Sequence, residues 1–274
     1  ISLDNDEIGV VLASGAGAFV VLNQKIGKAL QLNPALRVDW NERSGWEIIP
    51  QLNASYRYES FLFRGSVGRT TRDADFTERF NNYQRNPVPS GQRVGNPDLI
   101  SESSLSYEVG ADLFVTSSLK ISTTWFERFQ QSLIDYIATP YANMPRQVNL
   151  VPGANYLLAN NIDKVNTTGI ETDIQYTHQF NEQHSLAGGL GFVWMRSRSN
   201  DTIPSLYVSN HARELINFNV MYRYKKIAVS TNGLFKARRP QPIAAPFVPI
   251  SADYFILNTR VDLFLLKDKL AVFV

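Results

Sequence analysis

The chain has 274 residues, of which 44% are hydrophobic but only 19% charged, and its mean hydropathy is −0.19. This combination suits a protein with one apolar surface and one polar, uncharged surface, as in a membrane barrel. The formal net charge of +2 gives no indication of nucleic-acid binding, and the lack of cysteine excludes a disulfide framework and thiolate metal sites. No run of about 18 apolar residues occurs, which excludes a membrane-spanning helix.

The dominant period in the sequence is two, which is typical of strands with one apolar face. It is clear from Leu30 to Trp40, where apolar residues at even positions alternate with polar ones. The same alternation occurs in 52–58, 105–113, 119–125, 170–176, 216–224 and 255–265. Many of these segments approach the length of about ten residues that a tilted spanning strand needs. The sequence therefore predicts an all-β fold, a transmembrane antiparallel up-and-down β-barrel, with about twelve strands.

Short and long connections alternate between the predicted strands. Short links are expected at 59–60, 116–118, 181–184, 225–226 and 267–269, and long ones at 72–104, 137–164, 199–212 and 240–253. In an antiparallel meander this places short turns at one rim and long loops at the other, as in outer-membrane barrels. Soluble sandwiches and lipocalin-like barrels also alternate, but their strands are usually only about five or six residues long.

Three blocks of sequence resemble TonB-dependent outer-membrane receptors. The block GNPDLISESSLSYEVG at 95–110 is similar to a pattern of that family in which a loop descends into a strand. The block GRTTRDADFTERF at 68–80 is similar to a segment that normally contains Arg-x-Pro and Glu-Leu, although Asp73-Ala74-Asp75 lacks the proline. The block NIDKVNTTGIETDIQY at 161–176 resembles the entry to a later barrel strand. Within the family, the segment SLIDYI at 132–137 resembles cobalamin and siderophore receptors.

The resemblance implies that residues 1–274 form the C-terminal part of the receptor barrel, and that the N-terminal plug domain is absent from this chain. The family's barrel has about 22 strands, so about twelve would be slightly more than half. The chain begins at Ile1 without a basic segment or a cleavage signal, so we expect it to be a portion of a longer precursor. Its location would be the bacterial outer membrane.

The resemblance also implies a function, which is active import of a scarce nutrient, vitamin B12 or a ferric siderophore, with energy supplied through TonB. The expected partners are the TonB complex, contacted through an N-terminal TonB box outside this chain, outer-membrane lipids and the extracellular nutrient. A surface lipoprotein is a further candidate partner, and neither nucleic acid nor a cofactor is expected. The alternatives are a passive porin-like channel and a barrel enzyme such as a protease or phospholipase.

The sequence contains no motif for covalent chemistry, and we expect the protein not to be an enzyme. The histidines, His178, His184 and His211, are widely spaced, which speaks against a metal or acid–base site. The carboxylates of Asp73, Asp75 and Glu78 are of the type that calcium binds, but a fuller ligand set is missing, so solvated loop charges are favoured. The run Gly188, Gly189 and Gly191 indicates tight curvature or contact with a plug rather than phosphate binding.

Polar residues of the predicted strands should line the lumen, because a charge facing lipid near the midplane costs about 2–4 kcal/mol. The charged members of this set are Arg37, Asp39, Arg57, Arg64, Glu108, Asp112, Glu171, Asp173, Arg223, Arg260 and Asp262. Ligand contacts are expected from the long loops, where aromatic, amide and guanidinium groups suit a bulky polar ligand. The candidates are Tyr83, Arg85, Arg93, Tyr141, Asn143, Arg146, Asn155 and Tyr156.

Overall fold

A computed structural model describes residues 2–5, 9–153, 155–199, 212–238, 251–266 and 269–274. Strands dominate: β1 (Ser2–Asn5), β2 (Gly9–Leu12), β3 (Gly15–Val21), β4 (Gln24–Ile26), β5 (Leu30–Asn41), β6 (Gly45–Tyr58), β7 (Phe61–Arg72), β8 (Arg93–Val94), β9 (Glu102–Phe114), β10 (Leu119–Pro140), β11 (Asn155–Asn181), β12 (His184–Ser199), β13 (Ala212–Tyr224), β14 (Ile227–Arg238), β15 (Asp253–Leu265) and β16 (Leu270–Phe273). The helices are α1 (Phe76–Phe80) and the 3-10 turn η1 (Tyr141–Asn143). Within the described residues, no helix is long and apolar enough to cross a membrane.

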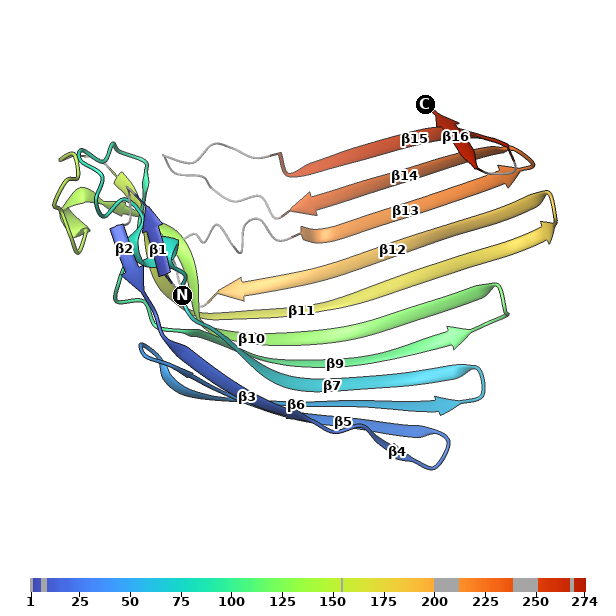
Figure 1. Cartoon of the computed structure of the whole chain (residues 1–274), viewed down its shortest axis with the longest axis horizontal. Helices are drawn as coiled ribbons and strands as arrows, with labels where there is room; N and C mark the ends of the chain where they lie inside the picture. Colours follow the sequence, from blue (N-terminus) through green and yellow to red (C-terminus); the bar gives the residue numbers. More distant parts are fainter. Residues whose placement is uncertain (1, 6–8, 154, 200–211, 239–250, 267–268) are drawn as a thin grey trace.

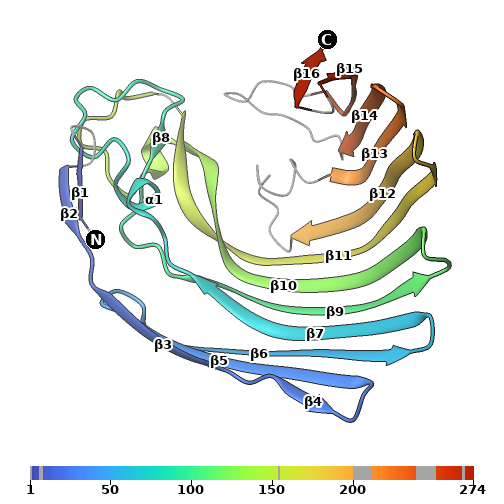
Figure 2. The ribbon, with the colours of Figure 1, turned by 45° about the vertical axis from the view of Figure 1, so that its right-hand side comes forward.

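One large antiparallel sheet organises the molecule. Twelve strands lie in the order β16-β15-β14-β13-β12-β11-β10-β9-β7-β6-β5-β3, while β4 pairs with β5 and β8 with β11. The sheet curls into an open trough, and the connections 73–101 and 141–153 gather with β1 and β2 at one end (Figures 1 and 2). Its outermost strands, β3 and β16, are not paired with each other within the described residues. The predicted all-β, up-and-down barrel is confirmed as a partial barrel.

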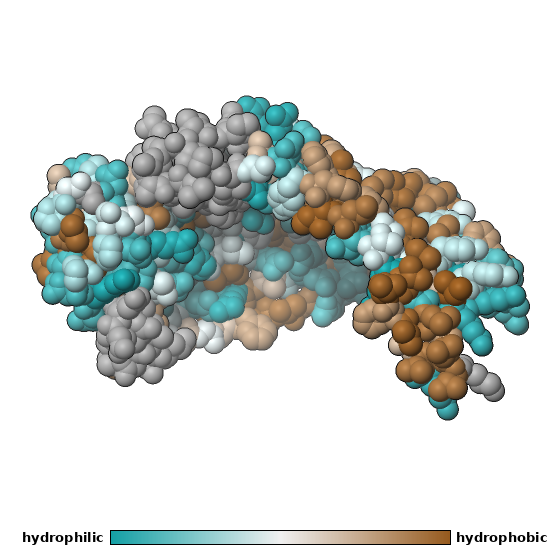
Figure 3. All heavy atoms as spheres, turned by 90° about the horizontal axis from the view of Figure 1, so that it is seen from above, coloured by the Kyte–Doolittle hydropathy of each residue, from teal (hydrophilic) through white to brown (hydrophobic). Residues whose placement is uncertain are grey.

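One face of the sheet is apolar because strand alternation and register bring hydrophobic positions together. Residues Gly65, Val109, Trp125, Ile170 and Trp194 lie directly opposite one another on β7, β9, β10, β11 and β12. Val109 is 61% exposed. In the space-filling view, hydrophobic residues gather at the right-hand end, over the strands, whereas hydrophilic residues predominate at the loop end (Figure 3). A continuous exposed apolar surface of this kind is suited to lipid contact.

The opposite face of the sheet is polar. Alternation places on it all the charged residues that were expected to line the lumen, and several pair with one another. The guanidinium group of Arg64 contacts Asp112 at 2.8 Å, and the Lys120 ammonium group contacts the same carboxylate at 3.2 Å. The shorter pair Arg260–Asp262 lies on β15 at 2.6 Å. Ion pairing across neighbouring strands stabilises charges that face a common interior.

The connections differ from the expectation in one place. The segment 137–164 was expected to be a long loop, but β10 continues to Pro140 and β11 begins at Asn155. Only residues 141–154 connect the two strands. The expected loop 72–104 corresponds to residues 73–101 and contains α1 and β8. The expected loops 199–212 and 240–253 fall mostly outside the described residues.

The two faces of the sheet should differ in their tolerance of charge. We expect Val109→Arg in the full-length protein to lower the free energy of unfolding in phospholipid vesicles by about 2–4 kcal/mol, because the guanidinium group would enter lipid. Ser66→Arg is the matched control, since Ser66 lies on the polar face opposite Glu108. Urea unfolding followed by tryptophan fluorescence measures both. An equal effect of the two substitutions would contradict the assignment of the lipid face.

Candidate ligand-binding site

A two-stranded arm rises beyond the sheet at the loop end. Within the described residues, β9 pairs with β10 as far as Gln131, and β12 pairs with β11 as far as Val165. Beyond these positions β10 and β11 continue to pair with each other up to Pro140 and Asn155. The buried residues Leu133, Ile137, Ile162 and Val165 pack together at the base of the arm. Apolar burial therefore keeps this hairpin extended, with only the short strand β8 paired to it among the described residues.

The connection 73–101 folds against the arm around a buried arginine. The guanidinium group of Arg79, only 3% exposed, donates to Asp73 Oδ1 at 2.6 Å and to the carbonyl groups of Pro97 and Leu99 at 2.7 Å. Gly95 passes so close to α1 that a side-chain carbon there would lie 2.6 Å from the Arg79 carbonyl oxygen. The two sequence blocks that resemble the receptor family thus pack directly on each other.

The carboxylates of this connection hold its structure together. Asp75 caps α1 by accepting from Glu78 N at 2.7 Å, and Glu78 accepts from Asp75 N at 2.9 Å. Arg72 binds both Glu78 at 2.8 Å and Glu102 at 2.7 Å. The expectation of solvated charges was wrong for Asp73 and Glu78, whose mostly buried side chains form ion pairs, whereas Asp75 is exposed. The described residues contain no group of three or more His, Asp or Glu able to hold a metal ion.

The connection 141–154 packs on the first one through a small apolar core. Val88, Val94, Met144, Leu150, Tyr156 and Leu158 form this core, with Tyr141 against it. The Tyr156 side chain is fully buried, and its hydroxyl lies 3.0 Å from the carbonyl oxygens of Val88 and Val151. The same hydroxyl accepts from Val151 N at 2.7 Å. The buried Tyr156 hydroxyl therefore links the two connections through its hydrogen bonds to Val88 and Val151.

Two aromatic rings lie between two arginine side chains that three connections bring together at the loop end. The Arg43 guanidinium carbon lies 5.2 Å from the centre of the Phe80 ring, and Phe80 meets Tyr83 edge to face with 5.8 Å between centroids. Arg146 covers the other side of the series, 4.2 Å from the Tyr83 centroid, and donates to the Tyr83 carbonyl at 2.8 Å. We call these four residues the cation–aromatic array. Such groups attract both anions and planar ligands.

A second cation–aromatic contact lies on the arm. Arg93 lies 4.9 Å from the centroid of Tyr136. Burial raises the pKa of Tyr136 to about 12, although the Arg93 charge acts in the opposite direction. Burial likewise raises the pKa of Tyr83 against the effect of Arg146. Both phenols therefore remain neutral hydrogen-bonding groups near neutral pH.

The remaining predicted ligand residues are spread over the loop cluster. Asn143 and Asn155 are exposed, and Tyr141 and Arg85 are half-buried. Among the predicted residues, the structure thus brings Tyr83 and Arg146 into contact, while Tyr156 is enclosed. Arg43, Phe80 and Tyr136 were not predicted as site residues, and Arg43 comes from a short turn far away in the sequence that carries no motif. His178 and His184 lie at the short-turn rim, bonded to Ser118 and Tyr222, and His211 lies outside the described residues.

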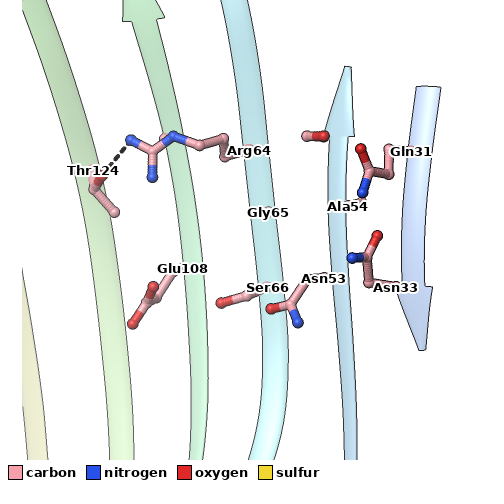
Figure 4. Close-up of a pocket in the computed structure, with 11 residues that line it drawn as sticks. Gln31, Asn33, Asn53, Ala54, Arg64, Gly65, Ser66, Glu108 and Thr124 are labelled. Atoms are coloured by element: carbon pink, nitrogen blue, oxygen red, sulfur yellow. Dashed lines mark hydrogen bonds between the residues drawn. The ribbon is translucent and has the colours of Figure 1, made fainter. Parts of the chain in front are cut away.

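The polar face of the sheet carries shallow hollows below the loop cluster. One hollow of about 300 Å³ is lined by side chains of β5, β6, β7, β9 and β10. Figure 4 shows Arg64 reaching over β9 to Thr124, while Glu108, Ser66 and Asn53 line the wall nearby. The Arg64 Nη2 to Thr124 Oγ1 distance is 3.3 Å. These groups can bind polar partners, but they form no catalytic constellation.

Comparison with known proteins agrees with this architecture. Residues 5–238 match the family profile described as TonB dependent receptor-like, beta-barrel. The chain belongs to the TonB-dependent receptors. The family consists of transporters, not enzymes, and membership places this chain in the bacterial outer membrane. Both expectations from the sequence are confirmed.

Solved structures of outer-membrane receptors share the fold. The siderophore receptor PirA from Pseudomonas aeruginosa is 17% identical, with a TM-score of 0.68 over 96% of this chain and 45% of that one. PirA from Acinetobacter baumannii is 18% identical, with a TM-score of 0.66 over 92% and 40%. The outer membrane transporter YddB from Escherichia coli is 11% identical, with a TM-score of 0.69 over 97% and 41%. The receptor chain spans less than half the length of these relatives. The search of curated proteins gave no match.

Removing the buried arginine should loosen the first loop. We expect Arg79→Met in the full-length receptor to speed amide hydrogen exchange over 73–101, because Asp73 and two carbonyl groups lose their hydrogen-bond donor. Each buried group left unsatisfied costs about 1–3 kcal/mol of stability. Hydrogen exchange with mass spectrometry measures the change. Gln84→Ala, an exposed position in the same loop, is the control. Unchanged exchange in Arg79→Met would show that Arg79 does not hold the loop.

Proposed function

We propose that this chain is the C-terminal barrel part of a receptor that actively imports a scarce nutrient across the outer membrane. A plug domain and a TonB box outside the chain would couple ligand uptake to the TonB complex. The family match over residues 5–238 is the observation that carries this proposal. The lipid-suited apolar face and the folded loop cluster support it, since an importer needs both a membrane body and an external binding surface.

The loop cluster suggests which nutrients to test. Its cation–aromatic array combines two guanidinium groups with two rings, which suits an anionic ligand with planar groups. Two of the solved relatives are siderophore receptors, and a third is a ferric enterobactin receptor with 17% identity and a TM-score of 0.64. A ferric siderophore is therefore the first candidate ligand, and vitamin B12 is the second.

The array owes its geometry to the rigid cluster beneath it. Arg146 is fixed by its bond to the Tyr83 carbonyl, and the loop that carries it is fastened through Tyr156 to Val88. Groups held in place before binding lose little conformational freedom when a ligand arrives, which favours affinity. The exposed residues Arg93, Asn143 and Asn155 would complete the contact surface.

Uptake by cells that express the full-length receptor tests the proposed function. Radiolabelled ferric enterobactin, other ferric siderophores and cobalamin are offered to strains with and without TonB. We expect saturable binding of one of these ligands in both strains and accumulation only in the strain with TonB. Leakage of small solutes that does not depend on TonB would instead support a passive porin-like channel.

The array should discriminate among ligands by charge. We expect Arg146→Gln to weaken binding of an anionic ferric siderophore about tenfold, because the array loses a guanidinium group. This factor corresponds to a loss of about 1.4 kcal/mol in binding free energy. Arg146→Lys keeps the charge but not the planar stacking, and should lie between Arg146→Gln and the wild type. Tyr83→Phe keeps the ring and serves as the control. Equilibrium binding to outer-membrane vesicles measures these effects. Wild-type affinity in Arg146→Gln would show that the array is not part of the binding site.

A further inference from the structure

A row of uncharged amide groups crosses the polar wall of the trough. The register aligns Gln175, Gly189, Asn219, Asn232 and Asn258 directly opposite one another on β11, β12, β13, β14 and β15. The four amide side chains are all exposed. Asn258 Nδ2 donates to Asn232 Oδ1 at 3.0 Å, so neighbouring amides are already linked. We call these five residues the amide row.

Glycines on β12 leave space for the amide side chains of this row. A side-chain carbon at Gly189 would lie 2.7 Å from Asn219 Oδ1, and one at Gly191 would overlap Asn217 Oδ1. The amide oxygens of Asn217 and Asn219 thus occupy the space above the glycines. A hollow of about 740 Å³ lies here, against about 610 Å³ for a hollow beside β3, β5 and β6 and about 300 Å³ for the hollow on β5 to β10. Gly189 and Gly191 therefore make room beside the amides.

The two sides of the wall differ in charge. Around the smaller hollow, Arg64, Asp112 and Lys120 form linked ion pairs, and Glu108 lies within the lining. Around the amide row, the bordering charges are Lys120 on β10, directly opposite Gln175, Asp173 on β11 and the Arg260–Asp262 pair on β15. The centre of the row itself carries none.

Neutral amides suit a surface along which a polar solute moves. Each amide offers two donors and one acceptor oxygen, so it can bond many polar groups in turn. The net gain of each such bond is only about 0.5–1.5 kcal/mol, because water competes for the same partners. Bonds to charged groups are about twice as strong. Conduction requires sites that bind weakly enough to release the solute to the next one.

We propose that a polar solute passes through the barrel over the wall of β11 to β15, where it crosses the amide row, and that the charged wall on β5 to β10 is not part of this path. This inference rests on the proposed import function. The structure assigns the path to the side where room, exposed amides and low charge coincide. The solute recognised there is a hydrated molecule with many hydrogen-bonding groups, whatever its net charge.

Thiol labelling of the full-length receptor tests the path. Single cysteines replace Asn219 or Asn232 in the row, and Asn53 or Ser66 on the charged wall, in a background without other cysteines. Fluorescein maleimide serves as the polar solute and is added to the outside of cells with and without TonB. In the strain with TonB we expect Asn219→Cys and Asn232→Cys to react about tenfold faster than the other two, because thiol reactivity follows exposure.

Each other outcome is decisive. Equal rates at the four positions, or faster reaction on the charged wall, would overturn the proposed path. Lack of reaction at all four sites, with full reaction after denaturation, would also overturn it, because the row would then be closed to solutes. Fast reaction at all four sites in both strains would indicate an open pore, and would count against the import function itself.

Discussion

The constraint on which the whole structure depends is that backbone hydrogen-bonding groups in lipid need partners within the protein. The antiparallel ladder meets it by pairing each strand of the sheet with its neighbours from β3 to β16. With the backbone satisfied, the alternation of side chains alone decides which face meets lipid. That is why a row such as Val109, Trp125 and Ile170 can stay exposed on one side while ion pairs line the other.

Alternation made most of the sheet predictable from the sequence. A half-exposed strand repeats its polarity every two residues, so its limits and its lipid face can be read directly. The arm of β10 and β11 escaped this rule because it is buried on both faces. Leu133 and Ile134 are adjacent in sequence and both buried, as are Leu158 and Ala159. Without alternation, this segment resembled a long loop, and only the packing of other loops on it makes it a strand pair.

The candidate site was less predictable because it is assembled from separate loops. Loop position and residue type sufficed to single out Tyr83 and Arg146, which do meet. The same criteria also selected Tyr156, whose ring and hydroxyl are enclosed by Val88 and Val151. Composition cannot distinguish a tyrosine that faces a ligand from one that fastens two loops together. Arg43 was missed for the opposite reason, since only the fold brings its short turn beside Phe80.

Import requires strong ligand binding at the loop cluster but weak ligand binding at the inner wall. Capture of a scarce ligand favours rigid, charged and aromatic groups, and the array has these on a scaffold fixed by Arg79 and Tyr156. If the wall bound the ligand as strongly as the loop cluster does, it would stop the passage of the ligand, because release from each site must remain fast. The change from guanidinium groups at the loop end to the amides of Asn219, Asn232 and Asn258 in the amide row is a change from strong to weak partners. Under the proposed function, binding energy is therefore concentrated at the entrance, and passage along the wall needs no site of comparable affinity.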